Sequence, residues 1–173
     1  MSTPDPRPLT PVVRPARPAD VRAIRGLVAP LAEARVLLQK EAVAYYESVA
    51  DFVVAELDGR IVGCGAMHVL WEDLGEVRTL AVDRSVLGRG VGAAILQRLV
   101  DRARELGLSR LFCLTFETRF FERHGFEPIE GQAVDPQVYA ELLRSYDEGV
   151  AEFLDLERVK PNTLGNTRML RVL

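Results

Sequence analysis

Three glycines at alternate positions, Gly88, Gly90 and Gly92, are the residues of this sequence best suited to chemistry. They follow the apolar run 80–82 and precede the segment 91–107, in which apolar residues recur at helical spacing. Glycine adopts positive φ and lets a ligand approach the backbone closely. A helix that begins directly behind such a turn offers unpaired N–H groups and the positive end of its dipole. This strand–turn–helix segment therefore predicts a cradle for a phosphate or pyrophosphate group.

Two other phosphate-binding loops match this turn less well. A Walker A loop carries Gly-Lys-Ser/Thr after its glycines, and the sequence has no such tripeptide here. A dinucleotide fingerprint is partly matched by Gly88-x-Gly90-x-x-Ala93, but that fingerprint opens a parallel βαβ unit and is followed by an acidic residue about 20 positions on. In this sequence a long stretch of expected strands and helices comes first, and Glu117 comes late. A plain glycine turn without a ligand is the remaining alternative.

The rest of the sequence predicts strands and helices that would position this turn. Strands are expected over residues 12–14, 52–57, 60–70, 76–82, 110–115, 126–129 and 167–173. Helices are expected over residues 18–31, 40–49, 91–107, 120–124 and 135–153. Asp58-Gly59 is typical of the tight turn of a hairpin, and Asp135-Pro136 is typical of a helix start. The order of elements is therefore β-α-α-β-β-β-α-β-α-β, followed by a helical insertion and a closing strand.

The segment Leu87-Gly88-Arg89-Gly90-Val91-Gly92 resembles the acetyl-CoA signature of the GNAT N-acetyltransferase superfamily, Arg/Gln-x-x-Gly-x-Gly/Ala. The segment 120–128 resembles the second signature of that superfamily, Phe-Tyr-Glu-Lys-x-Gly-Phe, and the element order matches as well. Leu87 stands where arginine or glutamine is usual, and Phe121 stands where a tyrosine general acid is usual. The resemblance implies an α/β (α+β) GNAT fold with a mixed, mostly antiparallel sheet that splays between strands four and five. Helices would flank the sheet, and an extra helix would precede the last strand.

Within the superfamily, the chain is similar to the acetyltransferase domain of N-acetylglutamate synthases, in a stand-alone form without the amino-acid-kinase domain. The similarity rests on Pro30-Leu31 and on the segments 36–40, 75–82, 111–115 and 120–128. It implies acetyl-CoA-dependent N-acetylation of the α-amino group of L-glutamate, the first step of arginine biosynthesis. Because Gln39 stands where the family usually carries a basic residue, L-glutamine is a second possible acceptor.

By the same resemblance, backbone amides of the fourth strand would hold the acetyl donor and stabilise the oxyanion. A donor in an oxyanion hole is worth about 3–4 kcal/mol. The residues expected to bind acetyl-CoA are Leu80, Ala81, Val82, Leu87, Gly88, Arg89, Gly90, Val91, Gly92, Ala93, Phe121 and Arg123, with Leu80 also counted as catalytic. A departing thiol has a pKa near 8.5, so a thiolate can leave without the missing tyrosine.

The amino acid that accepts the acetyl group needs a general base to deprotonate its ammonium group and cations to bind its carboxylate. Glu76 is the carboxylate expected to act as general base, directly or through water; the alternative is an ion pair with Arg78, two positions along the strand. The residues expected to bind the acceptor are Leu37, Gln39, Lys40, Arg78, Thr79 and Arg119. Arginine suits a carboxylate because it donates two parallel hydrogen bonds. Each cation taken alone is typical of an exposed ion-pairing residue, whereas the joint placement of Lys40, Arg78 and Arg119 favours a role in binding the acceptor.

Length and composition exclude some classes of function. The chain has 173 residues, 48% of them hydrophobic, and a net charge of −3, with no basic stripe for nucleic acid and no apolar run that would span a membrane. Cys64 and Cys113 lie in strand-like runs without a spacing typical of metal ligands, so we expect no metal and no disulfide. A cytoplasmic protein is expected, with small-molecule substrates, and superfamily analogy adds a homodimer.

The domain organisation expected from the sequence is simple. Residues 1–11 form a flexible tail, and residues 12–173 form a single GNAT domain. The helical insertion 135–160 could cover the mouth of the active site, contact a second subunit, or be a surface helix. Two other functions also fit the sequence: acetylation of a different amine, such as a protein N-terminus, a lysine or a polyamine, and a non-catalytic acyl-CoA-binding regulator.

Overall fold

The computed structural model describes residues 7–160 and 165–173. The chain divides into two compact units, one of residues 1–67 with 77–102 and one of residues 68–76 with 103–173. Strands β3 (Arg60–Trp71) and β4 (Leu74–Val82) each contribute residues to both units. The two units are described separately below.

The first unit is built on β1 (Val12–Pro15), β2 (Phe52–Leu57), β3 and β4, which are neighbours in that order. Strands β1 and β2 are antiparallel, with Val13 opposite Ala55, and β2 and β3 form an antiparallel hairpin. The hairpin turns through Asp58 and Gly59, whose φ angles are 49° and 78°. Two consecutive positive φ angles are what the Asp-Gly pair predicts.

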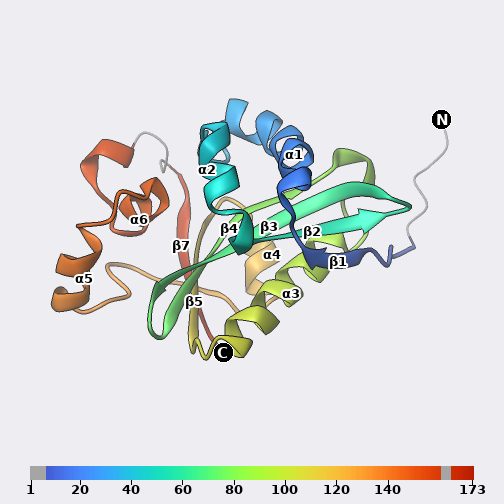
Figure 1. The fold of residues 1–173 in the computed structure, drawn as a ribbon. Coiled ribbons are helices and arrows are strands. Elements are labelled where there is room, and N and C mark those ends of the chain that lie inside the picture. The colour runs from blue at the N-terminus through green and yellow to red at the C-terminus, as the bar shows by residue number, and fades with distance from the viewer. Residues whose placement is uncertain (1–6, 161–164) are drawn as a thin grey trace. The chain divides into compact units, whose positions relative to one another are not determined.

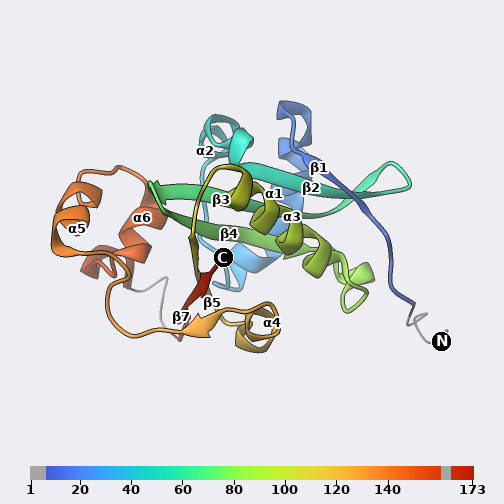
Figure 2. The same cartoon turned by 90° about the horizontal axis from the view of Figure 1, so that it is seen from below.

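Three α-helices accompany these strands. They are α1 (Val21–Glu33), preceded by the 3₁₀ turn η1 (Pro18–Asp20); α2 (Ala42–Glu47), followed by η2 (Val49–Asp51); and α3 (Val91–Glu105). Figure 1 draws α1 and α2 above the strands and α3 below them, and Figure 2 shows the same elements from below.

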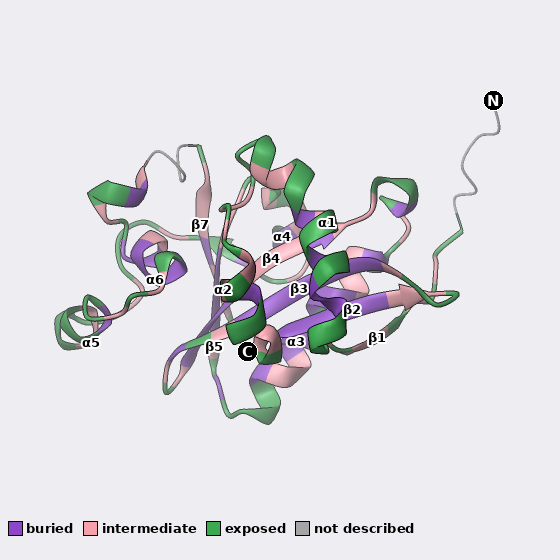
Figure 3. Cartoon of the chain, turned by 45° about the horizontal axis from the view of Figure 1, so that its top comes forward, coloured by how far each residue is buried: buried purple, intermediate pink, exposed green. Residues whose placement is uncertain are grey.

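The alternation of side chains along β3 explains why α1 and α3 cover opposite faces. Cys64 and Ala66 belong to the buried cluster that includes Ile24 and Val28 of α1. Gly63 and Gly65 point the other way, and a Cβ at either would lie 2.7–2.8 Å from Ile95 of α3. The absence of side chains at these glycines therefore lets α3 pack directly on the strand. Figure 3 shows the buried strands β2 and β3 beneath helices with exposed outer surfaces.

A partly buried ion pair joins the first strand to the start of α1. Arg14 donates two hydrogen bonds to the Asp20 carboxylate, at 2.8 and 3.1 Å, and a third to Glu56 on β2 at 3.1 Å. The backbone N–H of Arg17 also donates to Asp20, at 2.7 Å. The hydrogen bonds from Arg14 hold the pKa of the Asp20 carboxyl below its usual range.

Arg14→Met should therefore destabilise the protein by about 2 kcal/mol near neutral pH, because Asp20 would be left buried without its cation. The loss should be complete above about pH 4 and should shrink as the pH falls through the lowered pKa of Asp20. Urea unfolding at several pH values measures it. Arg60→Met removes an exposed ion pair with Asp83 at 3.9 Å and should change the free energy of unfolding by less than about 0.5 kcal/mol. Equal effects of the two variants would contradict the structural role of Arg14.

The second unit contains the start of β4, then β5 (Arg110–Thr115), β7 (Thr167–Val172) and β6 (Glu127–Pro128) as neighbouring strands. Strand β7 is antiparallel to both β5 and β6, and Cys113 lies opposite Met169. The helices are α4 (Thr118–Glu122), α5 (Pro136–Leu142) and α6 (Glu148–Phe153), with the 3₁₀ turn η4 (Glu157–Val159) after them. A buried cluster joins the sheet to α5 and α6 through Leu74, Phe112, Leu142, Val150 and Phe153.

The prediction of one helix over 135–153 is wrong, because the structure has two short helices there. Asp135 accepts hydrogen bonds from the N–H groups of Gln137 and Val138, both at 3.0 Å, and begins α5. Asp147 accepts from the Val150 N–H at 2.9 Å and begins α6. A second capping aspartate thus starts a new helix where the apolar spacing suggested continuity. Val138, Leu142, Tyr146 and Val150 follow helical spacing in the sequence, which placed Tyr146 on the apolar side of one helix. In the structure Tyr146 is fully exposed at the break. The other predicted elements are present, with ends that differ by a few residues.

Candidate functional site

Strand β4 is kinked at a residue that belongs to the predicted site. Thr79 has a φ of 54°, which is a rare conformation for a β-branched residue. Strained backbone of this kind persists where the surrounding structure imposes it, often at functional sites. The kink lies between Arg78 and Leu80, so it interrupts the regular alternation of β4 at the amides expected to face the acetyl donor. The sequence carries no signal for it.

A short 3₁₀ turn, η3 (Arg84–Val86), links β4 to the glycine turn. The Asp83 carboxylate begins it by accepting hydrogen bonds from the Ser85 N–H at 2.8 Å and the Ser85 hydroxyl at 2.6 Å. These hydrogen bonds lower the pKa of Asp83. Leu87, which follows, is 60% exposed. The turn was not predicted, but it places the glycines directly before α3.

The glycine turn has the geometry of an open backbone cradle. Gly88 and Gly90 have φ angles of 73° and 87°, and a Cβ built on either would have no atom within 4 Å. Both positions are therefore open to an approaching group. Helix α3 begins at Val91, so its first N–H groups follow the cradle, as anion binding at a helix start requires. Gly92 lies within α3 and is not among the glycines of positive φ. The arrangement fits the pyrophosphate of coenzyme A.

The described end of the N-terminal segment is attached to this turn. The Leu9 N–H donates to the Arg89 carbonyl oxygen at 2.9 Å, and Arg89 Nε donates to the Arg7 carbonyl oxygen at 3.2 Å. Part of the Arg89 guanidinium is thus used to hold residues 7–9 beside the cradle.

The remaining predicted residues of the first unit lie on β4, on α3 and before α2. Ala81 and Val91 are buried, and Leu80, Val82, Gly92 and Ala93 are half-buried. Leu37 packs against the buried cluster under α1. Gln39 is exposed and Lys40 is half-buried, both just ahead of α2.

In the second unit, Glu76 is the predicted residue with the most unusual environment. It lies on β4 with only 4% of its surface exposed. Its charge acts on the Cys113 thiol, whose pKa is raised first by burial and then by Glu76. It also acts on Arg168 of β7. Burial lowers the pKa of Arg168 below its usual value, and the charges of Asp155 and Glu76 oppose part of that shift. Titratable groups with such perturbed environments cluster at functional sites.

The predicted residues of the second signature divide into a core residue and two surface cations. Phe121 is buried, with its ring centroid 5.1 Å from those of both Phe120 and Phe126. Arg119 on α4 and Arg123 directly after it are exposed. Phe121 is therefore part of the hydrophobic core of this unit.

Two residues that the sequence analysis did not select, Asn166 and Arg168, are prominent in the second unit. Asn166 Oδ1 and Arg168 Nη2 are buried and, within the described ranges, have no hydrogen-bond partner. The only sequence signal would have been two polar residues, two positions apart, at the start of an apolar closing strand.

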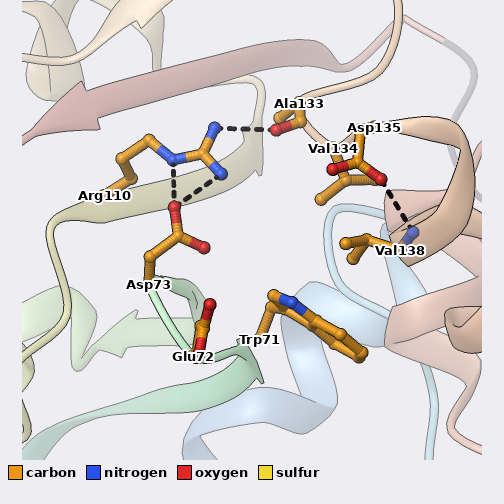
Figure 4. A pocket seen from close by; sticks show the side chains of 8 residues that line it. All are labelled: Trp71, Glu72, Asp73, Arg110, Ala133, Val134, Asp135 and Val138. Carbon is orange, nitrogen blue, oxygen red and sulfur yellow. Dashed lines mark hydrogen bonds and ion pairs between the residues drawn. The ribbon is translucent and has the colours of Figure 1, made fainter.

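The second unit also has a pocket of about 370 Å³ that none of the predicted site residues lines (Figure 4). Arg110 joins two of its walls: Nε and Nη2 each lie 3.0 Å from Asp73, and Nη1 donates to the Ala133 carbonyl oxygen at 2.7 Å. Trp71 lies along another wall. Arg110 therefore links the loop after β3, through Asp73, to the segment before α5, through Ala133.

Cys64 and Cys113 are buried and free. Burial raises the pKa of the Cys64 thiol to about 12, so neither cysteine has the environment of a reactive thiol. Among residues 7–160 and 165–173, no group of three or more His, Cys, Asp and Glu side chains is placed to hold a metal ion. No described helix has the length and apolar character that a bilayer crossing needs.

Known proteins with similar sequences are acetyltransferases. Residues 26–126 match the model of the acetyltransferase (GNAT) family. The chain is 58% identical to an amino-acid acetyltransferase of Mycobacterium tuberculosis over 97% of this chain and 98% of that protein. It is 34% identical to an amino-acid acetyltransferase of Neisseria meningitidis over 66% of this chain, which corresponds to 27% of that longer protein.

Known structures agree with this pattern. Rv2747 from Mycobacterium tuberculosis, solved in complex with CoA and NLQ, matches with a TM-score of 0.91 and 59% identity, covering 94% of this chain and 99% of that chain. N-acetylglutamate synthase from Neisseria gonorrhoeae, solved with coenzyme A and N-acetyl-glutamate, matches with a TM-score of 0.76 and 25% identity, covering 96% of this chain and 36% of that chain.

These matches confirm the fold class inferred from the two glycine-containing motifs, and they confirm the resemblance to the acetyltransferase domain of N-acetylglutamate synthases. At the level of the family they also confirm acetyl-CoA as the co-substrate. The chain belongs to the acetyltransferase (GNAT) family.

Proposed function

We propose that this chain transfers the acetyl group of acetyl-CoA to the α-amino group of L-glutamine or L-glutamate. The observation that carries the proposal is the 58% identity to an amino-acid acetyltransferase over nearly the full length of both chains. The open glycine cradle supports it, because the acetyl donor carries a pyrophosphate. The kink in β4 supports it, because the kink lies at the amides expected to face the thioester.

In the proposed mechanism, the backbone of residues 88–93 binds the pyrophosphate of coenzyme A, which supplies the acetyl thioester. Backbone N–H groups around Leu80, next to the kink at Thr79, donate to the thioester oxygen as it becomes an oxyanion. Glu76 takes one proton of the acceptor ammonium, directly or through water, so that a neutral amine is available. The N–C bond forms, the C–S bond breaks, and the electron pair leaves with sulfur as a thiolate. The second proton that the nitrogen must lose to become an amide passes to solvent.

The acceptor is proposed to bind through the cations identified in the sequence. Arg78 lies next to the kink and is half-buried, whereas Arg119 is exposed. Lys40 and its neighbours Leu37 and Gln39 precede α2. A carboxylate held by an arginine makes charge-assisted hydrogen bonds, which are stronger than neutral ones.

Thiol release from acetyl-CoA in the presence of single amino acids tests the proposal. Release with glutamine or glutamate, and formation of the N-acetyl product by mass spectrometry, are expected. Release with a polyamine or a peptide N-terminus instead would favour acetylation of another amine. Binding of coenzyme A without release for any amine would favour a non-catalytic regulator, the alternative suggested by Leu87 and Phe121.

Arg78→Ala should raise the KM of the amino acid by about 10–100-fold, the loss expected for one hydrogen bond to a charged group. The KM of acetyl-CoA should change by less than about threefold. Arg84→Ala removes an exposed arginine from the turn that follows β4 and should change neither constant. An equal rise in both KM values for Arg78→Ala would count against its role at the acceptor.

The wider setting of the reaction is part of the same proposal. The resemblance to N-acetylglutamate synthases suggests the first step of arginine biosynthesis. Two free cysteines suggest a reducing cytoplasm, and superfamily analogy suggests a homodimer. Light scattering after size-exclusion chromatography would measure the oligomeric state directly.

A further inference from the structure

The segment that precedes β1 is bonded to the glycine turn at two points. The Leu9 N–H donates to the Arg89 carbonyl oxygen at 2.9 Å, and Arg89 Nε donates to the Arg7 carbonyl oxygen at 3.2 Å. Arg7 and Arg89 are 82 positions apart in the sequence, and both belong to the first unit. Residues 7–9, which we name the strap, are therefore fixed to one residue of the turn through its backbone and its side chain.

Proline residues make the strap stiff. Pro8 lies in its middle, and Pro11 follows Leu9 after one further residue. A proline ring fixes its own φ and restricts the preceding residue to extended conformations. Strand β1 begins directly afterwards at Val12 and pairs with β2. The strap is thus a short link between the sheet and Arg89, and little conformational entropy is lost in holding it there.

The hydrogen bond from Leu9 determines which way one amide of the turn points. The peptide bond that joins Arg89 to Gly90 is trans, so its C=O and its N–H project in opposite directions. Because the Leu9 N–H lies on the carbonyl side, the Gly90 N–H is directed away from the strap. The Gly90 carbonyl oxygen accepts a hydrogen bond from the Ala94 N–H at 3.0 Å, so Gly90 supplies one of the N–H groups at the start of α3.

The turn itself does not impose this orientation, because glycines stand on both sides of Arg89. Gly88 and Gly90 have φ angles of 73° and 87°, and glycine adopts positive and negative φ about equally well. The peptide between Arg89 and Gly90 can therefore rotate as a unit at little steric cost. A rotated peptide would present a carbonyl oxygen where a pyrophosphate needs an N–H. A hydrogen bond that forms in only one orientation shifts the equilibrium toward that orientation.

We propose that the strap is a positioning element for acetyl-CoA. By holding the Arg89 carbonyl group it presents the Gly90 N–H to the pyrophosphate, and it raises the affinity for the donor without contacting it. A diphosphate that selects the same peptide orientation stabilises the strap in return, because such coupling is reciprocal. This inference rests on the proposed function, in which the backbone of residues 88–93 binds the pyrophosphate.

Leu9→Pro removes the N–H that bonds Arg89. It should raise the KM of acetyl-CoA about 3–10-fold, because one backbone hydrogen bond shifts the orientation equilibrium only by its own net contribution. Acetyl-pantetheine carries the same thioester and pantetheine arm without the diphosphate, and its kcat/KM should change by less than about twofold, because uncoupled binding is unaffected. A general folding defect would lower the rates with both donors alike, so the ratio between the donors reports on the strap.

Two control variants separate the N–H from the side chain and from the proline ring. Leu9→Ala keeps the N–H, and Thr10→Pro adds a proline at the exposed neighbouring residue. Both should leave the KM of acetyl-CoA within about twofold of the wild type, since the bond to Arg89 is retained. A rise in either control equal to that in Leu9→Pro overturns the proposal. An unchanged KM in Leu9→Pro also overturns it, and so does a lower KM, which would mean that the strap blocks the cradle.

Amide exchange of the wild-type protein, followed by NMR, tests the proposal without any substitution. Saturating coenzyme A should slow exchange of the Leu9 N–H about 3–10-fold, whereas saturating pantetheine should not, because the coupling is reciprocal. Unchanged exchange of Leu9 overturns the role of the strap while the proposed function stands. Equal affinity of the wild type for coenzyme A and pantetheine would show that the diphosphate is not bound, and it overturns the strap together with the proposed donor site.

Discussion

Glu76→Gln is expected to lower kcat about 10²–10⁴-fold, the usual contribution of a general base. Glu76 is almost fully buried on β4, two residues before Arg78 and three before the kinked Thr79. Glutamine has nearly the same shape and keeps an acceptor oxygen, but it cannot take a proton from the acceptor ammonium. The KM of acetyl-CoA should therefore change little, since the donor does not depend on this proton transfer.

The pH dependence separates this role from a structural one. Raising the pH increases the fraction of acceptor that is already neutral, so the deficit of the variant should narrow as the pH rises. Glu105→Gln makes the same change at an exposed position on α3 and should leave kcat unchanged. A deficit in Glu76→Gln that is constant with pH, accompanied by a lower melting temperature, would assign Glu76 to structure.

The first unit shows how much local pattern can predict. The apolar runs on either side of Asp58-Gly59 and that pair itself predict the β2–β3 hairpin, because both are properties of the nearest neighbours in sequence. Gly88 and Gly90 predict the open cradle for the same reason. The kink at Thr79 could not be predicted, because nothing about a threonine between Arg78 and Leu80 favours positive φ. The surrounding strand geometry imposes it.

The second unit shows where local pattern is insufficient. Val138, Leu142, Tyr146 and Val150 follow helical spacing, yet Asp147 begins a second helix and leaves Tyr146 in solvent. The environment of Arg168 depends on Phe112, Phe153 and two carbonyl groups that are distant in sequence. Charged residues are exposed by default, so only the folded chain shows that this arginine is desolvated.

Gly90→Val should raise the KM of acetyl-CoA about 10–100-fold and lower stability by about 1–3 kcal/mol, because a β-branched residue is strained at positive φ. Gly90 has a φ of 87° and open space where a Cβ would lie. The valine would occupy that space, which the pyrophosphate needs, and would also favour a backbone that turns the N–H groups away from it. Calorimetry with coenzyme A and steady-state kinetics measure the effect, while kcat at saturating donor should fall much less.

Gly107→Val separates the loss of the cradle from backbone strain. Gly107 follows the other end of α3, has a φ of 80° and likewise has no atom within 4 Å of a built Cβ. The two variants should lose similar stability, because each forces a branched residue into the same region of φ. Only Gly90→Val should weaken coenzyme A binding, since only the N-terminal end of α3 presents unpaired N–H groups and a positive dipole to an anion. Equal affinity for coenzyme A in both variants would show that the diphosphate binds elsewhere, and the proposed acetyl transfer would then need a different donor site.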